Sequence, residues 1–434
     1  MSPDMQAPVV FTSPSRGTGL TPVRTQLTNG AVVTVKQTRK TPAVSMNLAV
    51  RVGSADDPAG AAGTAHLLAR VIDRGTTRRT ADEIAELLEN RGSSLSVVVG
   101  RHQLSLVCAC LSEDFDAVFS LLAEMLIAPA LPDSEIATRK GEVVTAIRQE
   151  EDHPGVRSVE GLLKLLYGPD HPYGMPPKGT IPAVEGITRS SLAAFRSAHF
   201  GPNVLSAVIV GDIDPAHASD IAARRLETWA TPAQPSRDVP TPSRATERRE
   251  VVVPMPAKAQ VDIAYGFIAI RRTDPAYYAY WLMNNALGQY ALGGRLGSNI
   301  RERQGMAYSV GSVLEANVGE GPLMVRAGVA AANVEKAVAS IDAELRTLRQ
   351  DGLSTRELNE SRQYLTWSMP RALETNQGIA TFLQTTEFYG LGLDYDLRLP
   401  DLLNAVTLDD VQAAARTTID PDRAAVVIAG PYER

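Results

Sequence analysis

The chain has 434 residues, of which 44% are hydrophobic and 21% are charged, and its formal net charge is −6. This length allows about two to four domains with large cores. No basic stripe appears, which argues against nucleic acid as a partner, and the arginine pairs at 78–79 and 271–272 are predicted to lie on solvated surfaces. No apolar run approaches the ~18–20 residues of a membrane span. Cys108 and Cys110 are too close on one predicted strand for an unstrained disulfide, which leaves the compartment open.

The N-terminal part of the chain predicts an arm followed by strands and helices. Residues 1–19 are rich in Pro, Ser and Gly, which favours an arm. Residues 25–35 predict a β-hairpin, because Asn29-Gly30 is a dipeptide that tight hairpin turns prefer. The residues at 80–83 form a capping-box pattern that opens a helix. The remaining elements are predicted as strands at 44–52, 95–99, 103–111 and 205–210 and as helices starting near 63 and at 84–91, 115–126, 133–151 and 192–199.

A Pro/Ser/Thr-rich segment at 231–247 divides the chain and is predicted to be an exposed linker. The order of elements recurs after it, since 193–211 and 413–430 each predict a helix followed by a strand that ends in glycine. We therefore predict an α+β fold of two homologous halves, 20–230 and 248–434, each an antiparallel sheet with helices packed on one side. In the second half, strands are predicted at 261–267, 308–316, 323–329 and 424–428 and helices at 277–288, 334–349, 355–369 and 411–418.

The helix that starts near residue 63 has the layout of a metal-binding helix without most of its ligands. Two imidazoles four residues apart, with a carboxylate between them at the third offset, share one helical face and can bind one ion and activate a water. Here His66 is followed at those offsets by Ala69 and Arg70. A guanidinium cannot bind Zn²⁺, and one imidazole gives little zinc affinity without other ligands. We expect no metal in this chain, and the alternative interpretation of His66 is a buried or capping histidine.

Three stretches identify a family resemblance that covers about residues 21–431. They are 63–76, the His-Pro-Tyr-Gly sequence at 171–174, and 294–310. In these stretches the chain resembles the pitrilysin/insulinase-type inverted-zincin metallopeptidases. The resemblance is greatest to the non-zinc-binding subunits of short bacterial members that pair two chains of this size and are related to mitochondrial processing peptidase.

The resemblance implies that the metal site of this chain is degenerate. Active members carry a third zinc ligand, a glutamate on a later helix, and the corresponding position here is Ala146. The nearest carboxylates are Glu142 and Glu150, and a slip of one helical turn could bring either onto the same face. Together with His66, Ala69 and Arg70, Ala146 completes the degenerate site that the resemblance implies.

The resemblance also implies a substrate-binding pair in the C-terminal half. Active members use an Arg and a Tyr seven residues apart to reach the peptide held at the zinc, and Arg301 and Tyr308 have this spacing. An Arg can donate two parallel hydrogen bonds to a carbonyl or carboxylate, and a Tyr hydroxyl can donate to an oxyanion. The alternative is that Arg301 caps a helix and Tyr308 packs on the core.

These features predict the catalytically silent subunit of a heterodimeric zinc endopeptidase. The resemblance implies a homologous partner chain that carries Zn²⁺ and closes with this chain as a clamshell around peptide substrates. No catalytic residue is then complete in this chain alone, and Arg301 and Tyr308 act in trans. The alternatives are a non-enzymatic structural or binding protein on the same fold, like the core subunits of respiratory complexes, and an independent peptidase with a displaced metal site. The resemblance favours a periplasmic location, and a cytoplasmic one stays open.

Overall fold

The computed structural model of the chain describes residues 19–229, 233, 238–290 and 293–433. The predicted arm at 1–19 therefore lies almost entirely outside the described residues, and the predicted linker at 231–247 lies partly outside them. No helix in the described part of the chain is both long enough and apolar enough to cross a membrane.

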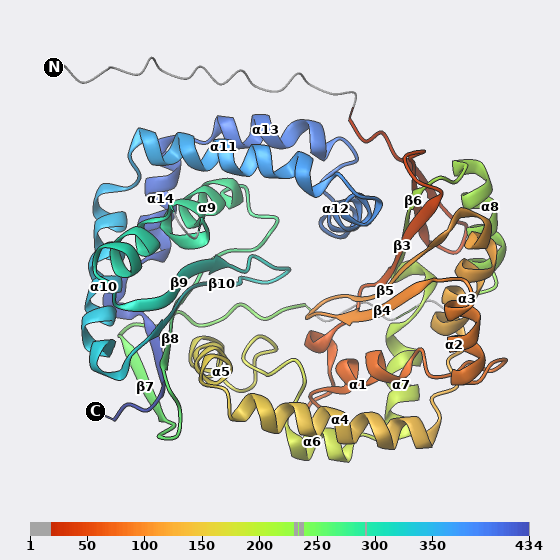
Figure 1. Cartoon of the computed structure of the whole chain (residues 1–434), viewed down its shortest axis with the longest axis horizontal. Helices are drawn as coiled ribbons and strands as arrows, with labels where there is room; N and C mark the ends of the chain where they lie inside the picture. Colours follow the sequence, from red (N-terminus) through yellow and green to blue (C-terminus); the bar gives the residue numbers. More distant parts are fainter. Residues whose placement is uncertain (1–18, 230–232, 234–237, 291–292, 434) are drawn as a thin grey trace.

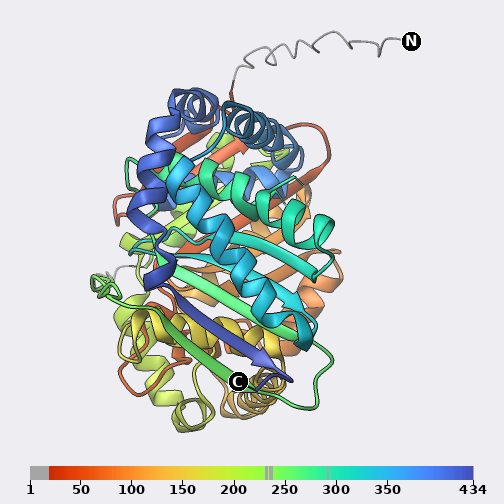
Figure 2. The ribbon, with the colours of Figure 1, turned by 90° about the vertical axis from the view of Figure 1, so that its left-hand side faces the viewer.

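Two mixed β-sheets form the framework of the molecule (Figure 1). The first has the strand order β1-β2-β6-β3-β5-β4 and the second β7-β11-β8-β10-β9. β2 pairs in parallel with β6, and β7 pairs in parallel with β11, which runs beside it in Figure 2. The prediction of purely antiparallel sheets is therefore wrong for one pair in each sheet. The strands are β1 (Val23–Gln26), β2 (Val32–Gln37), β3 (Ala43–Val50), β4 (Ser94–Val99), β5 (Leu104–Leu111), β6 (Leu205–Gly211), β7 (Arg249–Pro254), β8 (Val261–Ile268), β9 (Ala307–Leu314), β10 (Pro322–Val329) and β11 (Ala425–Gly430).

The helices follow the local sequence signals closely. The Thr80–Glu83 capping box is present at the start of α2, and the hairpin predicted at 25–35 is the antiparallel pair β1–β2. The helix predicted at 133–151 has the same bounds in the structure. The helices are α1 (Thr64–Val71), α2 (Ala81–Glu89), α3 (Phe115–Ile127), α4 (Asp133–Glu151), α5 (Pro154–Tyr167), α6 (Ile181–Gly186), α7 (Arg189–His199), α8 (Pro215–Leu226), α9 (Tyr277–Asn284), α10 (Val334–Asp351), α11 (Thr355–Ala372), α12 (Asn376–Tyr389), α13 (Tyr395–Ala405) and α14 (Leu408–Thr418), with π-helical turns η4 (Asn285–Gln289) and η5 (Gly297–Arg303).

Each sheet is covered on both faces, and on one face the cover comes from the other half of the chain. Leu162 of α5 packs with Ala264 and Val427 of the second sheet. In the same way Leu383 of α12 packs with Val208 of the first sheet. Successive strand residues point to opposite faces, so the neighbours of these strand residues join the larger cores under the other helices. The prediction that helices cover only one side of each sheet is wrong, and α5 and α12 interlock the two halves (Figure 1).

The His-Pro-Tyr-Gly sequence builds a polar joint between the halves. The buried Tyr173 hydroxyl accepts a hydrogen bond from the Gly319 N–H at 2.8 Å and forms a second hydrogen bond, of 2.7 Å, with Nε2 of His102. His171 accepts from the Tyr173 N–H at 3.0 Å and donates to the Pro240 carbonyl at 2.9 Å. One short loop therefore holds together the β4–β5 turn, the β9–β10 hairpin and the connecting segment, by which we mean residues 238–247 between the two halves.

Arg272 corrects another expectation from the sequence. Arg271 is exposed as predicted, but Arg272 is only 8% exposed. Its guanidinium lies 3.8 Å from the ring centroid of Tyr277 and donates a hydrogen bond to the Tyr395 hydroxyl at 2.9 Å. A buried guanidinium can be accommodated in this way because aromatic faces attract cations.

Candidate functional site

The helix α1 begins at a glycine that no other residue could replace without strain. Gly63 has φ 97°, and a Cβ at this position would lie 2.4 Å from the Lys178 carbonyl oxygen. The Asp57 carboxylate accepts hydrogen bonds from the N–H groups of Gly63 at 2.7 Å and Ala65 at 2.8 Å. These bonds satisfy donors that a helix N-terminus leaves without partners, while the close approach at Gly63 brings α1 against the loop that carries Lys178.

The four positions of the degenerate metal site lie on α1 and α4, which pack together. His66 is partly buried, Ala69 is 3% exposed and Arg70 is exposed. On α4, the residues Glu142, Ala146 and Glu150 follow one another at intervals of four, which places them on one helical face. The two carboxylates therefore flank the position where the resemblance implies a third ligand.

Both flanking carboxylates are held by side-chain cations. Arg70 donates to Glu142 at 2.7 Å, and Arg139 donates to the other oxygen of Glu142 at 2.5 Å. These two bonds, with Arg139 the stronger cause, lower the pKa of Glu142 to about 2. One turn beyond Ala146, Glu150 forms an ion pair with Lys178. Each of the two carboxylates that could replace the missing ligand is therefore already paired with a cation, so neither is free to bind a metal.

The site does not fit a zinc ion. Burial, followed by the positive charges of Lys178 and Arg70, lowers the pKa of His66 to about 4, so its imidazole is neutral at pH 7. A neutral imidazole could bind a metal, but the adjacent ammonium and guanidinium repel a divalent cation. Among the residues that the structure describes, no group of three or more His, Cys, Asp or Glu could hold a metal.

Arg301 lies in a π-helical turn whose inner side is fixed in the core. Ile300 is fully buried, and the Gln304 N–H reaches back five residues to the Asn299 carbonyl at 3.1 Å. Gly305 follows with φ 61°, a conformation that turns the chain into β9. The side chain of Arg301 is 25% exposed, and its Nε donates to Glu302 at 2.9 Å. Isolated π-helical turns are rare and are found frequently at functional sites.

Tyr308 lies on β9, the edge strand of the second sheet, next to the buried Met306 and Ala307. Its side chain is 72% exposed, which excludes the alternative in which it packs on the core. An edge strand also offers unpaired backbone N–H and C=O groups to another extended chain.

The structure thus contains two separate groups of candidate residues. The degenerate metal site is on α1 and α4, and Arg301 and Tyr308 are on η5 and β9 (Figure 1). Within the described ranges, no hydrogen bond or ion pair joins the two groups. Lys178 was missed by sequence reasoning, because no local pattern connects it with a helix more than a hundred residues earlier.

The fold and the site define the class as an α+β protein with a zinc-peptidase framework whose metal site is incomplete. Two family models match the chain, "Insulinase (Peptidase family M16)" over residues 32–165 and "Peptidase M16 inactive domain" over residues 186–365. The chain belongs to the M16 (insulinase) peptidase family.

Relatives and solved structures agree with this assignment. An uncharacterized zinc protease of Mycobacterium leprae is 26% identical, with 94% of this chain and 92% of that protein covered. An uncharacterized zinc protease of Bacillus subtilis, YmxG, is 24% identical, with 92% and 96% covered. The crystal structure of a peptidase M16 inactive domain from Pseudomonas fluorescens has a TM-score of 0.87 and 25% identity and covers 95% of this chain and 98% of that one. A protease from Helicobacter pylori, at 17% identity and a TM-score of 0.84, shares the fold over 94% of this chain and 99% of its own.

Proposed function

We propose that this chain is the zinc-lacking, catalytically silent subunit of a two-chain M16 endopeptidase. One observation carries the proposal: the carboxylates of the metal-site region are neutralised by Arg70 and Lys178, whereas Tyr308 stays 72% exposed on an edge strand. The first feature removes catalysis by this chain alone. The second keeps a donor available for a ligand outside the chain.

In this proposal β9 binds an extended peptide substrate by adding it as a further strand. Arg301 lies just before the turn into β9, and its planar fork can hold a peptide carbonyl or a carboxylate through two N–H groups. The Tyr308 hydroxyl donates to the oxygen that gains negative charge as the peptide bond is attacked. One such donor contributes a factor of about 10²–10³ to kcat.

The partner is a homologous chain with a complete metal site, which closes on this chain as a clamshell. The zinc protease names of the relatives support a peptidase as the assembled enzyme. The partner then supplies the hydrolysis, and this chain supplies substrate binding and charge stabilisation.

The test is peptidase activity of this chain alone, of its partner alone and of the mixture. We expect activity only in the mixture, and we expect Tyr308→Phe to lower kcat about a hundredfold with little change in KM. Tyr364→Phe is the matched control, since Tyr364 is an exposed tyrosine on α11. Full activity of a mixture that carries both Tyr308→Phe and Arg301→Lys would contradict the shared site. A chain that binds its partner without any peptidase activity would instead support the structural alternative.

A further inference from the structure

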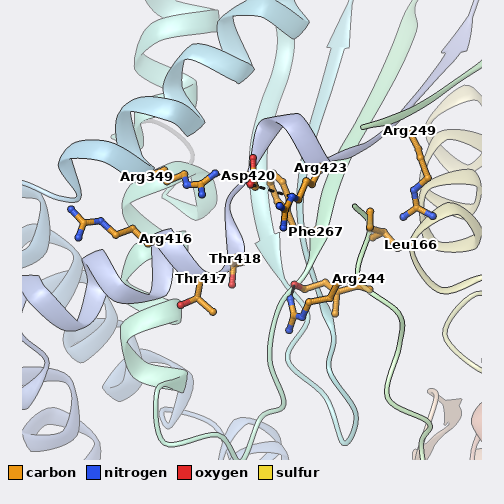
Figure 3. Close-up of a pocket in the computed structure, with 12 residues that line it drawn as sticks. Leu166, Arg244, Arg249, Phe267, Arg349, Arg416, Thr417, Thr418, Asp420 and Arg423 are labelled. Carbon is orange, nitrogen blue, oxygen red and sulfur yellow. Dashed lines mark hydrogen bonds and ion pairs between the residues drawn. The ribbon is translucent and has the colours of Figure 1, made fainter. Parts of the chain in front are cut away.

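Five arginines line a small cavity on the C-terminal half, and Figure 3 draws Arg249 and Arg416 at its opposite sides with the other three between them. It has a volume of about 150 Å³ and lies between the ends of α10 and α14, the start of β7, the end of β8 and the connecting segment at 244–245. One carboxylate, that of Asp420, lines it, which leaves an excess of four positive charges. The arginines are Arg244, Arg249, Arg349, Arg416 and Arg423.

The neighbouring acidic groups neutralise only part of this excess. Asp420 is shared by Arg349 at 2.9 Å and Arg423 at 3.7 Å. Arg244 reaches Glu320 at 3.4 Å and also donates to the Ile268 carbonyl at 2.8 Å. The structure records no side-chain partner for Arg249 or Arg416 among the residues it describes.

The ends of two helices account for only part of the remaining charge. Arg349 and Arg416 lie in the last turns of α10 and α14, where a cation interacts favourably with the negative end of the helix dipole. Each helix end is equivalent to roughly half a negative charge, so the two together offset about one of the four excess charges. About three remain.

Arg249 gives the sharpest sign of a missing ligand. Its Nε and Nη2 atoms are buried and have no hydrogen-bond partner. It is the one arginine of the described chain for which two such nitrogens are recorded. A buried donor without a partner is costly, and a bound acceptor would remove that cost.

We propose that this cavity binds a phosphate-class oxyanion, which links the connecting segment to the ends of α10 and α14. Guanidinium groups are suited to this ligand because they donate parallel hydrogen bonds to its oxygens. The cavity volume of about 150 Å³ is enough for a single tetrahedral anion. A second cavity of about 500 Å³ shares Arg349, Arg416 and Asp420 with the first.

The experiment measures the unfolding temperature of the full chain in chloride, phosphate, sulfate and acetate at equal ionic strength. A ligand that binds only the native state stabilises it, by an amount that grows with its concentration relative to Kd. With phosphate at about 100 times its Kd, we expect a saturable rise of about 3 °C in the unfolding temperature. Sulfate should act similarly and acetate weakly. The anion could be free phosphate or the phosphate group of an ester, and a parallel titration with glycerol 3-phosphate separates these two sources. A rise with inorganic phosphate alone indicates the free anion, and a rise with both indicates that esters also bind.

Variants distinguish this site from a general salt effect. We expect Arg249→Gln to raise the apparent Kd for phosphate at least tenfold, and Arg416→Gln, at an exposed position, to do the same without loss of the fold. Arg224→Gln is the matched control, since Arg224 is an exposed arginine on α8 that pairs with Asp220. The proposal is wrong if phosphate causes no saturable rise, or if the rise is the same in Arg249→Gln and Arg416→Gln as in the unchanged chain.

Discussion

Among single residues, Arg70 and Lys178 decide the chemistry of the N-terminal half. They place positive side-chain charge beside His66 and bind the carboxylates on either side of Ala146. A chain that keeps a helix pair of this shape can therefore stay folded without a metal. The positive charge of these two side chains compensates the two carboxylates of α4.

This compensation leads to a prediction about rebuilding the site. We expect Ala69→Glu, Arg70→His and Ala146→Glu together to bind zinc only weakly, because Lys178 still repels a divalent cation. Adding Lys178→Met should raise zinc affinity at least tenfold, so that about one zinc per chain remains after dialysis. The measurement is metal content by atomic absorption. Arg70→His alone is the control and should stay free of zinc, and equal zinc content with and without Lys178→Met would contradict the role given to Lys178.

The sequence predicted part of this site and not the rest. The spacing of His66, Ala69 and Arg70 is local, so one helical period was enough to show that the ligands are missing. The partners of Glu142 and Glu150 could not be read in the same way. Lys178 reaches Glu150 only through tertiary packing, and its loop is fixed by the close approach to Gly63. The roles of Arg301 and Tyr308 remain predictions, although the exposure of Tyr308 is now known.

Among the elements, the joint around Tyr173 should respond to acid. Burial, with a smaller contribution from Arg101, lowers the pKa of His102 to about 4 in the folded chain, whereas it is about 6.5 in an unfolded chain. The folded state therefore binds fewer protons between these values, so this contribution to stability is present above about pH 6.5 and is lost as the pH falls towards 4.

The corresponding prediction concerns His102→Gln. Burial disfavours protonation of His102 in the folded chain, and we expect the free energy of unfolding to fall by at most about 3 kcal/mol from this group between pH 6.5 and 4. In His102→Gln that part of the pH dependence should disappear. Urea unfolding at several pH values measures it, and His153→Gln, at an exposed position, is the control. An unchanged pH dependence in His102→Gln would exclude this role.

The helix α12 provides a second prediction at this scale. Leu383 is 2% exposed and packs against Val208 and Val210 of β6, which belong to the other half of the chain. We expect Leu383→Ala to destabilise the chain by about 3 kcal/mol, because it leaves a cavity in a packed core.

The effect of Leu383→Ala should be visible far away in the sequence. Amide hydrogen exchange should become faster in β6 as well as in α12. Leu397→Ala is the control, because Leu397 is 40% exposed on α13. Faster exchange limited to α12 would show that the two halves do not share this core.

The fold was predicted well where the signals are local and poorly where they are not. Turns, capping boxes and periodic helices gave most element positions, such as α2 and α4. The parallel pairing of β2 with β6 and the exchange of α5 and α12 between halves depend on contacts between distant parts of the chain. No helix was predicted at the position of α12, and helical periodicity would not show which sheet its buried face covers.

For the whole molecule, the interlocked halves limit how the proposed clamshell of two chains could open to admit a peptide. α5 and α12 each cross to the other sheet, and the Tyr173 joint ties the connecting segment to both halves. A hinge inside the chain would expose both of these shared cores. In the proposed two-chain peptidase, we therefore expect opening to take place between the two subunits and not within this one.

This argument predicts a single unfolding transition for the full chain. In scanning calorimetry we expect one peak in which the calorimetric and van't Hoff enthalpies agree, because neither half can bury its second sheet face alone. Two independent halves would instead unfold in two transitions. Leu383→Ala provides the internal test, since it should shift the whole peak to lower temperature and not split it. A split peak would show that the halves separate, and the motion that admits a peptide could then take place within the chain.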